Sequence, residues 1–102
     1  MNKVILTGNL TKEVELRYTT KNIAVAHFTI AVNRDKKDES DFLNCVAYGN
    51  QAELITKYLD KGSRVGIDGH IQTGSYENKE GKKVYTTDII VDKVEFLSNK
   101  QE

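Results

Sequence analysis

A single helical pattern among several β-strand patterns is the feature that most constrains the fold of this chain. Residues 51–61 repeat their apolar side chains at helical spacing, with Asn50 as the expected N-cap and Gly62 as a left-handed stop. Residues 13–19 alternate charged and apolar side chains, which predicts a short edge strand. Longer strand patterns cover residues 3–10, 23–33, 41–48, 64–73 and 84–97. The expected order is therefore three main strands, one helix and two further strands.

This order of elements limits the possible architectures. Five main strands with one helix between the third and the fourth form the order of an OB-fold, a five-stranded, partly open Greek-key barrel. The predicted class is thus all-β with a small α contribution. With 102 residues the chain has room for one such domain, which we assign to residues 1–97, followed by a short C-terminal extension at 98–102. OB-folds bind oligonucleotides or oligosaccharides, so the fold alone does not choose the ligand.

Charge and cysteine content exclude several classes of function. The 15 basic and 15 acidic residues cancel, so a nucleic-acid site must come from local clusters of Lys and Arg. The one cysteine, Cys45, excludes an internal disulfide, and neither it nor His27 and His70 has the neighbours that a metal site needs. We expect no catalytic residue, no metal and no cofactor. No apolar run approaches the roughly 20 residues that span a bilayer, so we expect a cytoplasmic protein without a membrane partner.

Two aromatic residues on the third main strand form the first candidate binding feature. Phe42 and Tyr48 lie six residues apart, so their side chains share one face, roughly 20 Å apart at about 3.3 Å per residue. If that face is exposed, both rings can stack on nucleic-acid bases regardless of sequence. Parity alone also allows the opposite arrangement, in which both rings point inward and Leu43, Cys45 and Ala47 point outward.

Two hairpin loops supply further candidate contacts. Tyr76 stands at the mouth of a polar hairpin with its turn near Gly81, and is a candidate third stacking platform. The basic residues of this hairpin are Lys79, Lys82 and Lys83, whose charge is mostly offset by Glu77 and Glu80. That balance also fits a solvated hairpin without a binding role. The loop at residues 34–41 is slightly acidic overall, and Arg34 is its best candidate for a phosphate contact.

Short motifs follow one another along nearly the whole chain. They are NKVILTGNL at residues 2–10, ELRYT at 15–19, AVA at 24–26, FTIAVNR at 28–34, DFLNC at 41–45, QAE at 51–53, KGS at 61–63 and YENKEG at 76–81. No single motif is specific, but the ordered set resembles the bacterial and phage single-stranded DNA-binding protein family. The resemblance implies an OB-fold, usually assembled as a homotetramer, that binds single-stranded DNA without catalysis in DNA replication, recombination and repair.

The resemblance also assigns roles to individual residues. Phe42, Tyr48 and Tyr76 match base-stacking positions of the family, which favours the outward arrangement of the first two rings. Lys3 and Arg17 match basic positions commonly near the DNA path. Contacts to the DNA backbone are expected from Lys3, Arg17, Arg34, Lys79, Lys82 and Lys83.

Some positions depart from the family pattern. Family members often have basic residues where this chain has Asn44, Gln72, Gly74 and Ser75, and many place an aromatic residue near the position of Arg34, where this chain has none. Binding is therefore expected to be less electrostatic than in strongly basic members. Family members typically continue into a linker and an acidic tip, whereas this sequence stops at Glu102. We therefore expect either a naturally short form or a truncated chain, in both cases without recruitment through an acidic tail.

The first strand predicts self-association. Its apolar residues Val4, Ile5 and Leu6 would leave an exposed edge in a monomer, and such edges are normally paired or covered. We expect these residues at the interface of a homotetramer, with a homodimer as the alternative. The expected location is the cytoplasm, in association with the nucleoid or inside the host cell of a phage. The competing function is an OB-fold replication accessory module that acts mainly through protein–protein interaction.

Overall fold

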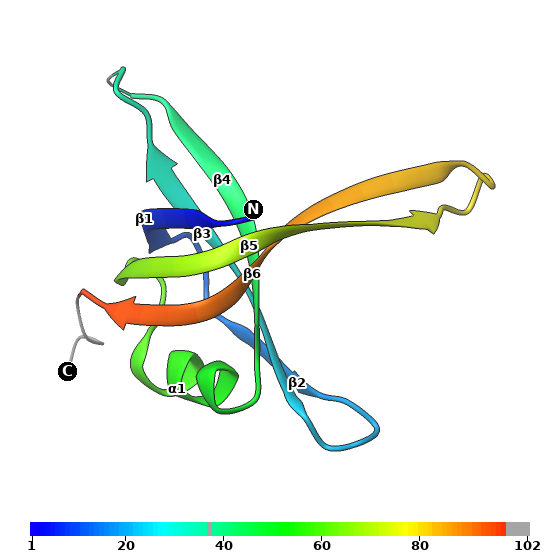
Figure 1. Cartoon of the computed structure of the whole chain (residues 1–102), viewed down its shortest axis with the longest axis horizontal. Coiled ribbons are helices and arrows are strands. Elements are labelled where there is room, and N and C mark those ends of the chain that lie inside the picture. The colour runs from blue at the N-terminus through cyan, green and yellow to red at the C-terminus, as the bar shows by residue number, and fades with distance from the viewer. Residues whose placement is uncertain (37, 98–102) are drawn as a thin grey trace.

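The computed structural model describes residues 1–36 and 38–97, so the predicted extension at 98–102 lies outside the described residues. Figure 1 shows a small curled sheet with two projecting hairpins and one helix at its base. The elements in chain order are β1 (Val4–Leu10), β2 (Glu15–Tyr18), β3 (Ala24–Asn33), β4 (Ser40–Tyr48), α1 (Asn50–Tyr58), β5 (Arg64–Glu77) and β6 (Lys83–Phe96).

The sheet closes into a barrel. Its strands follow the order β1-β5-β6-β4-β3-β2. Because β1 also pairs with β3, the five strands β1, β5, β6, β4 and β3 form a closed ring, with β2 attached outside it along β3. β4 pairs with β6 in parallel, whereas β1 with β3, β1 with β5, β2 with β3, β3 with β4 and β5 with β6 pair antiparallel. This is the predicted OB-fold topology with one addition, because the short strand β2 lies beside the first half of β3. Counting β2, the helix follows the fourth strand instead of the third.

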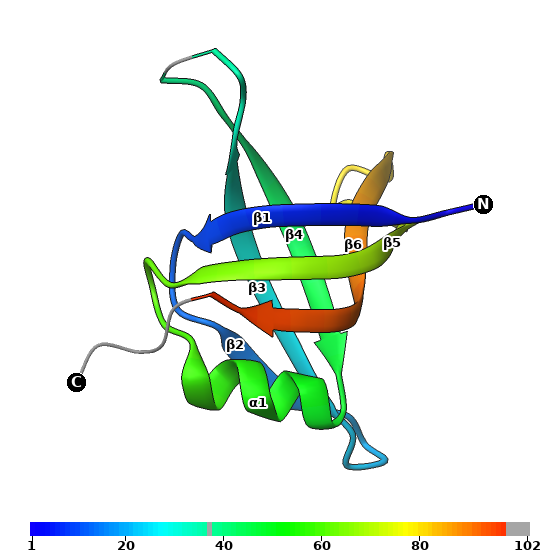
Figure 2. The ribbon, with the colours of Figure 1, turned by 60° about the vertical axis from the view of Figure 1, so that its left-hand side comes forward.

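The core fills the barrel between the inward faces of the strands. On β3 the buried side chains alternate along the strand, at Ala24, Ala26, Phe28 and Ile30, as a period of two requires. The helix α1 lies across one end of the barrel, where Ala52 is buried (Figure 2). Other members of the core cluster are Leu10, Cys45, Ala47, Ile55, Leu59, Val65, Ile67, Ile89 and Val91.

The predicted helix limits need correction. The helix covers Asn50–Tyr58 instead of 51–61, and its N-cap is Gly49, which has a φ of 64° and makes no side-chain cap hydrogen bond. The helix ends early because Leu59 takes an extended conformation and inserts into the core. Gly62 does have a positive φ, 91°, but it lies in the turn that follows, where its N–H donates to the carbonyl of Leu10.

The β5–β6 hairpin is longer than the sequence predicts. Tyr76 belongs to β5 itself, and the tip is reduced to a turn in which the Asn78 side-chain oxygen accepts hydrogen bonds from the N–H groups of Glu80 and Lys82. The strand pairing shifts register next to Gly69, where an added Cβ would collide with the carbonyl of Ile90. This irregularity precedes the part of the hairpin that projects from the barrel (Figure 1).

Candidate nucleic-acid interface

Two aromatic rings on β4 point away from the core. Phe42 is 67 % exposed and Tyr48 is 49 % exposed, whereas Cys45 and Ala47 are buried in the core. The outward arrangement is therefore the one that the structure adopts. The inward alternative fails because residues of odd number on this strand face the barrel interior.

The strand register places the third ring on the same face. Val46, which has the parity of Phe42 and Tyr48, pairs with Ile90 of β6, and Ile90 pairs with His70 of β5. Paired residues share a face, and residues two apart on one strand do so as well. Tyr76 lies six residues beyond His70 and is 56 % exposed. The structure therefore brings all three predicted rings onto one continuous outer face of β4, β6 and β5.

A shallow depression on this face lies along the middle of β3 and β4. It is lined by Lys12, Glu15, His27, Phe28, Thr29, Asn44, Cys45 and Asp88. At its floor the Thr29 hydroxyl donates a 3.1 Å hydrogen bond to the Asn44 side-chain oxygen. One basic and two acidic side chains line the depression, so the surface near Phe42 and Tyr48 is polar without being strongly basic.

Arg34, a predicted backbone contact, is already paired with a carboxylate. Its Nε and Nη2 atoms both donate to Oδ1 of Asp41, at 3.0 and 2.7 Å. The hydrogen bond raises the pKa of Arg34 and lowers the pKa of Asp41 below its ordinary value. Asp41 directly precedes Phe42 on β4, so the side chain of Asp41 lies on the opposite face of the strand from the first ring. A DNA phosphate would have to compete with Asp41 for the guanidinium.

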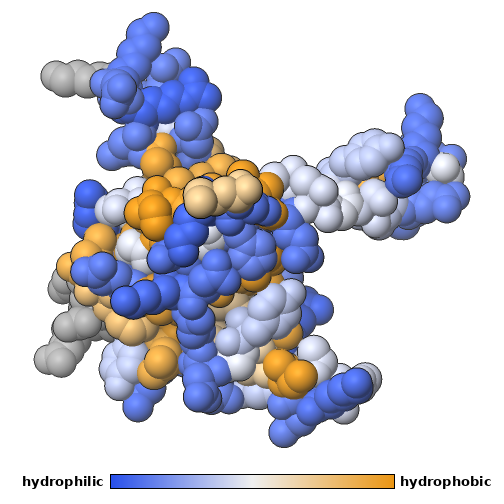
Figure 3. All heavy atoms as spheres, viewed as in Figure 1, coloured by the Kyte–Doolittle hydropathy of each residue, from blue (hydrophilic) through white to orange (hydrophobic). Residues whose placement is uncertain are grey.

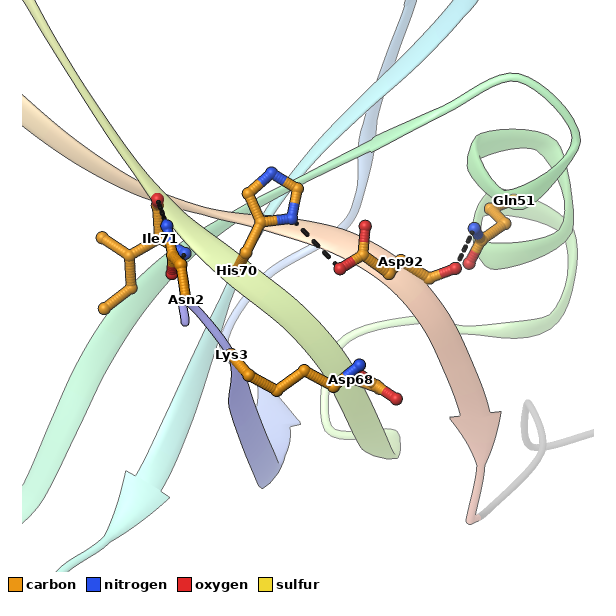
Figure 4. A network of polar contacts seen from close by, with 7 residues as sticks. All are labelled: Asn2, Lys3, Gln51, Asp68, His70, Ile71 and Asp92. Atoms are coloured by element: carbon orange, nitrogen blue, oxygen red, sulfur yellow. Dashed lines mark hydrogen bonds and ion pairs between the residues drawn. The ribbon is translucent and has the colours of Figure 1, made fainter.

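Lys3 is paired in the same way. Its Nζ atom lies 2.7 Å from Oδ1 of Asp68 on β5, and the hydrogen bond to Asp68 raises the pKa of the ammonium group. Figure 4 shows this ion pair near a hydrogen-bond contact in which His70 Nδ1 lies 3.1 Å from Asp92 Oδ2. The backbone oxygen of Asp92 accepts a 2.8 Å hydrogen bond from the Gln51 amide. These contacts tie β5 and β6 to β1 and to the helix.

The other predicted basic residues lie on exposed surfaces. Arg17 on β2 pairs with Val25, which pairs with Tyr48, so one row across three strands carries a guanidinium and the Tyr48 ring. At the β5–β6 hairpin the exposed basic side chains are Lys79, Lys82 and Lys83. Hydrophilic residues cover both projecting hairpins in Figure 3, whereas hydrophobic ones gather near β1 and the N-terminus.

Metal-ligating and nucleophilic groups were sought among the described residues. Within residues 1–36 and 38–97, no cluster of three or more His, Cys, Asp or Glu side chains is arranged to hold a metal ion. Burial of Cys45 raises the pKa of its thiol to about 12, which keeps it protonated and unreactive. The same described ranges contain no helix that is both long and apolar enough to cross a membrane.

The predicted interface strand presents one open edge. β1 pairs with β5 from Val4 to Asn9, while in the described part of the chain its second edge meets β3 only at Asn9 and Leu10. Val4 and Leu6 are partly buried against the core, whereas Ile5 is 70 % exposed. An apolar side chain and unpaired backbone groups therefore lie together on the surface of β1.

Sequence reasoning missed two kinds of residue. The first kind is the acidic partners: the sequence did not predict that Asp41 pairs with Arg34 or that Asp68 pairs with Lys3. A search for opposite charges on paired strands would have suggested both ion pairs. The exposed ring of Tyr85 was also missed, because it has the inward parity of β6 and alternation predicts burial for it.

Comparison with known proteins agrees with this geometry. A model of the single-strand binding protein family matches residues 1–97. The chain is 49 % identical to single-stranded DNA-binding protein 3 of Listeria innocua, 49 % identical to the single-stranded DNA-binding protein of Halalkalibacterium halodurans and 50 % identical to that of Bacillus cereus. The alignments cover 95–99 % of this chain but only 60–66 % of those relatives, so the chain spans about three-fifths of their length. This chain belongs to the single-strand binding protein family.

Proposed function

We propose that this protein binds single-stranded DNA without catalysis and largely without regard to base sequence. The observation that carries the proposal is the placement of Phe42, Tyr48 and Tyr76, all exposed, on one outer face of the barrel. Membership of the family and the names of the relatives support it. Coating of this kind protects the single strands that arise in replication, recombination and repair, and the site of action is the cytoplasm at the nucleoid.

The physical basis of binding is stacking assisted by a few phosphate contacts. Every base has a π-face, so an exposed ring accepts any base, and stacking contributes about 1–3 kcal/mol per base. The chain has no net charge, and Lys3 and Arg34 are engaged by carboxylates. Arg17, Lys79, Lys82 and Lys83 therefore supply the phosphate contacts most readily. The resulting affinity depends less on salt than that of a strongly basic protein.

A titration at two salt concentrations tests the proposal. Single-stranded DNA, single-stranded RNA and duplex DNA of a few tens of nucleotides are added at equal length, and tyrosine emission is followed, which is clean because tryptophan is absent. Single-stranded DNA should quench the emission and shift in a gel, whereas the duplex, whose bases are stacked internally, should not. Unchanged emission and mobility at low salt would reject DNA binding and favour an accessory module that binds other proteins.

We further propose that the open edge of β1 is an interface between copies of this chain, in a homotetramer or, failing that, a homodimer. Ile5 and the unpaired backbone groups of β1 support this. Sedimentation of the full chain should show an assembly at micromolar concentration, and Ile5→Lys should dissociate it. Ile23→Lys, at an exposed isoleucine outside the strands, is the control and should leave the assembly intact. A stable wild-type monomer would overturn this proposal and leave DNA binding untouched.

A further inference from the structure

Tyr85 is the most exposed aromatic side chain among residues 1–36 and 38–97, with 75 % of its surface accessible. It lies on β6 in the projecting hairpin (Figure 1), where it pairs with Ser75. Tyr76 pairs with Val84, the residue before Tyr85, so the two tyrosines occupy opposite faces of the same two-stranded ribbon. The face that carries Tyr85 is not the outer face described above.

The folding of the chain does not account for a large ring at this position. Tyr85 has the parity of Ile89 and Val91, whose side chains lie in the core. Where β6 leaves the barrel, there is no core against which side chains of this parity can pack, so the Tyr85 ring is exposed to solvent. Burial within the subunit therefore gives no reason for an aromatic residue here.

The surroundings of Tyr85 suit a nucleic acid better than a protein surface. The Lys83 ammonium lies 5.6 Å from the ring centroid, and Ser75 lies opposite Tyr85. Glu77, which pairs with Lys83, adds an acidic group to the same face. A shallow depression at the hairpin tip, close to Tyr85 in the chain but not lined by it, is formed by Ser75, Tyr76, Glu77, Gly81 and Lys83. The cores of protein interfaces are apolar and poor in lysine. A ring beside an ammonium group and a hydroxyl is instead typical of a platform for bases and phosphates.

The edges of the ribbon leave a path between its two faces. β1 ends its pairing with β5 at Gly69, and β4 pairs with β6 only at Ile89 and Ile90. Beyond these points, in the described part of the chain, β5 and β6 pair with each other alone. A single strand can therefore leave the outer face at Tyr76 and pass around the ribbon edge to Tyr85.

We propose that Tyr85 is a second stacking platform for single-stranded nucleic acid, on the back of the β5–β6 hairpin, with Lys83 as its phosphate contact. The proposal rests on the proposed function, because it extends the path of the same strand. A strand that passes Tyr76 turns around the hairpin and stacks a further base on Tyr85.

The test compares Tyr85→Leu and Tyr85→Phe with the wild type, using oligo-dT of increasing length at fixed salt. Tyr85→Leu should bind the shortest oligonucleotides normally and lose about 5- to 150-fold in affinity once the strand is long enough to reach the hairpin back, the equivalent of one stacked base. Tyr85→Phe should restore the affinity because it keeps the ring. Tyr18→Leu, at an exposed tyrosine beside the helix, is the matched control and should leave binding unchanged.

Each result decides the matter. If the wild type binds DNA and Tyr85→Leu matches it at all lengths, this proposal is overturned while the proposed function stands. If Tyr85→Leu instead changes the sedimentation of the free protein, the ring contacts another copy of the chain and the proposal is equally overturned. If the wild type binds no single strand, the proposed function itself fails.

Discussion

The ion pair between Arg34 and Asp41 should restrain DNA binding. Two nitrogen atoms of Arg34 donate to one oxygen of Asp41, and Phe42 follows directly on the strand. Asp41→Asn removes the negative charge that holds the guanidinium of Arg34. We therefore expect Asp41→Asn to bind single-stranded DNA more tightly than the wild type, because Arg34 becomes available for a phosphate.

The expected magnitude follows from counterion release. One additional phosphate contact steepens the plot of log K against log salt by about 0.7 for a single strand. Between 50 and 200 mM salt, a fourfold rise, the advantage of Asp41→Asn over the wild type should shrink by four to the power of about 0.7, or about threefold. The gain is thus largest at low salt.

Fluorescence titrations at four or more salt concentrations measure both quantities. Asp35→Asn is the matched control, since it makes the same charge change in the adjacent loop, whereas the guanidinium of Arg34 donates to Asp41. It should raise the affinity less and leave the slope unchanged. Equal salt slopes for the wild type and Asp41→Asn would refute the reasoning. Equal gains in affinity for Asp41→Asn and Asp35→Asn would show a general effect of charge instead of the release of Arg34.

Three further predictions test other parts of the account. Arg17→Gln should lower the salt slope by about 0.7 with tyrosine quenching intact, and an unchanged slope would remove Arg17 from the DNA path. Gly69→Ala should lower the free energy of unfolding in urea by about 1–3 kcal/mol, because its Cβ collides with the Ile90 carbonyl, whereas Gly66→Ala makes only ordinary contacts and should change little. Cys45, with a pKa raised to about 12, should be only about one part in 10,000 thiolate at pH 8 and resist thiol reagents until urea unfolds the chain, and rapid labelling of the native protein would contradict its burial.

Local patterns predict most of the strands because each strand has one buried face. The alternation at Ala24, Ala26, Phe28 and Ile30 is legible in the sequence, and strand order alone predicts the barrel. The predicted helix end was wrong because Leu59 takes an extended conformation and packs in the core instead of continuing the helix, so tertiary packing overrides helix propensity. Local propensity carries no information on such tertiary contacts.

The candidate site was harder to predict in its details. The spacing of Phe42 and Tyr48 predicts that they share a face but not which face, and the family resemblance supplied the direction. The pairing of Lys3 with Asp68 depends on strand register across 65 positions of the chain, which no local pattern reveals. The exposure of Tyr85 was not predicted, because alternation along a strand indicates burial only where that strand lies in the barrel. β6 extends beyond the barrel at Tyr85.

The most direct test of the central claim compares the affinity and the salt slope of the aromatic variants. Phe42→Ala, Tyr48→Ala and Tyr76→Ala should each cost about 1–3 kcal/mol of single-stranded DNA binding, while the salt slope stays that of the wild type, because stacking releases no counterions. Circular dichroism should show that the exposed substitutions leave the fold intact. A slope that falls together with the affinity, or an affinity that does not fall at all, would contradict the account.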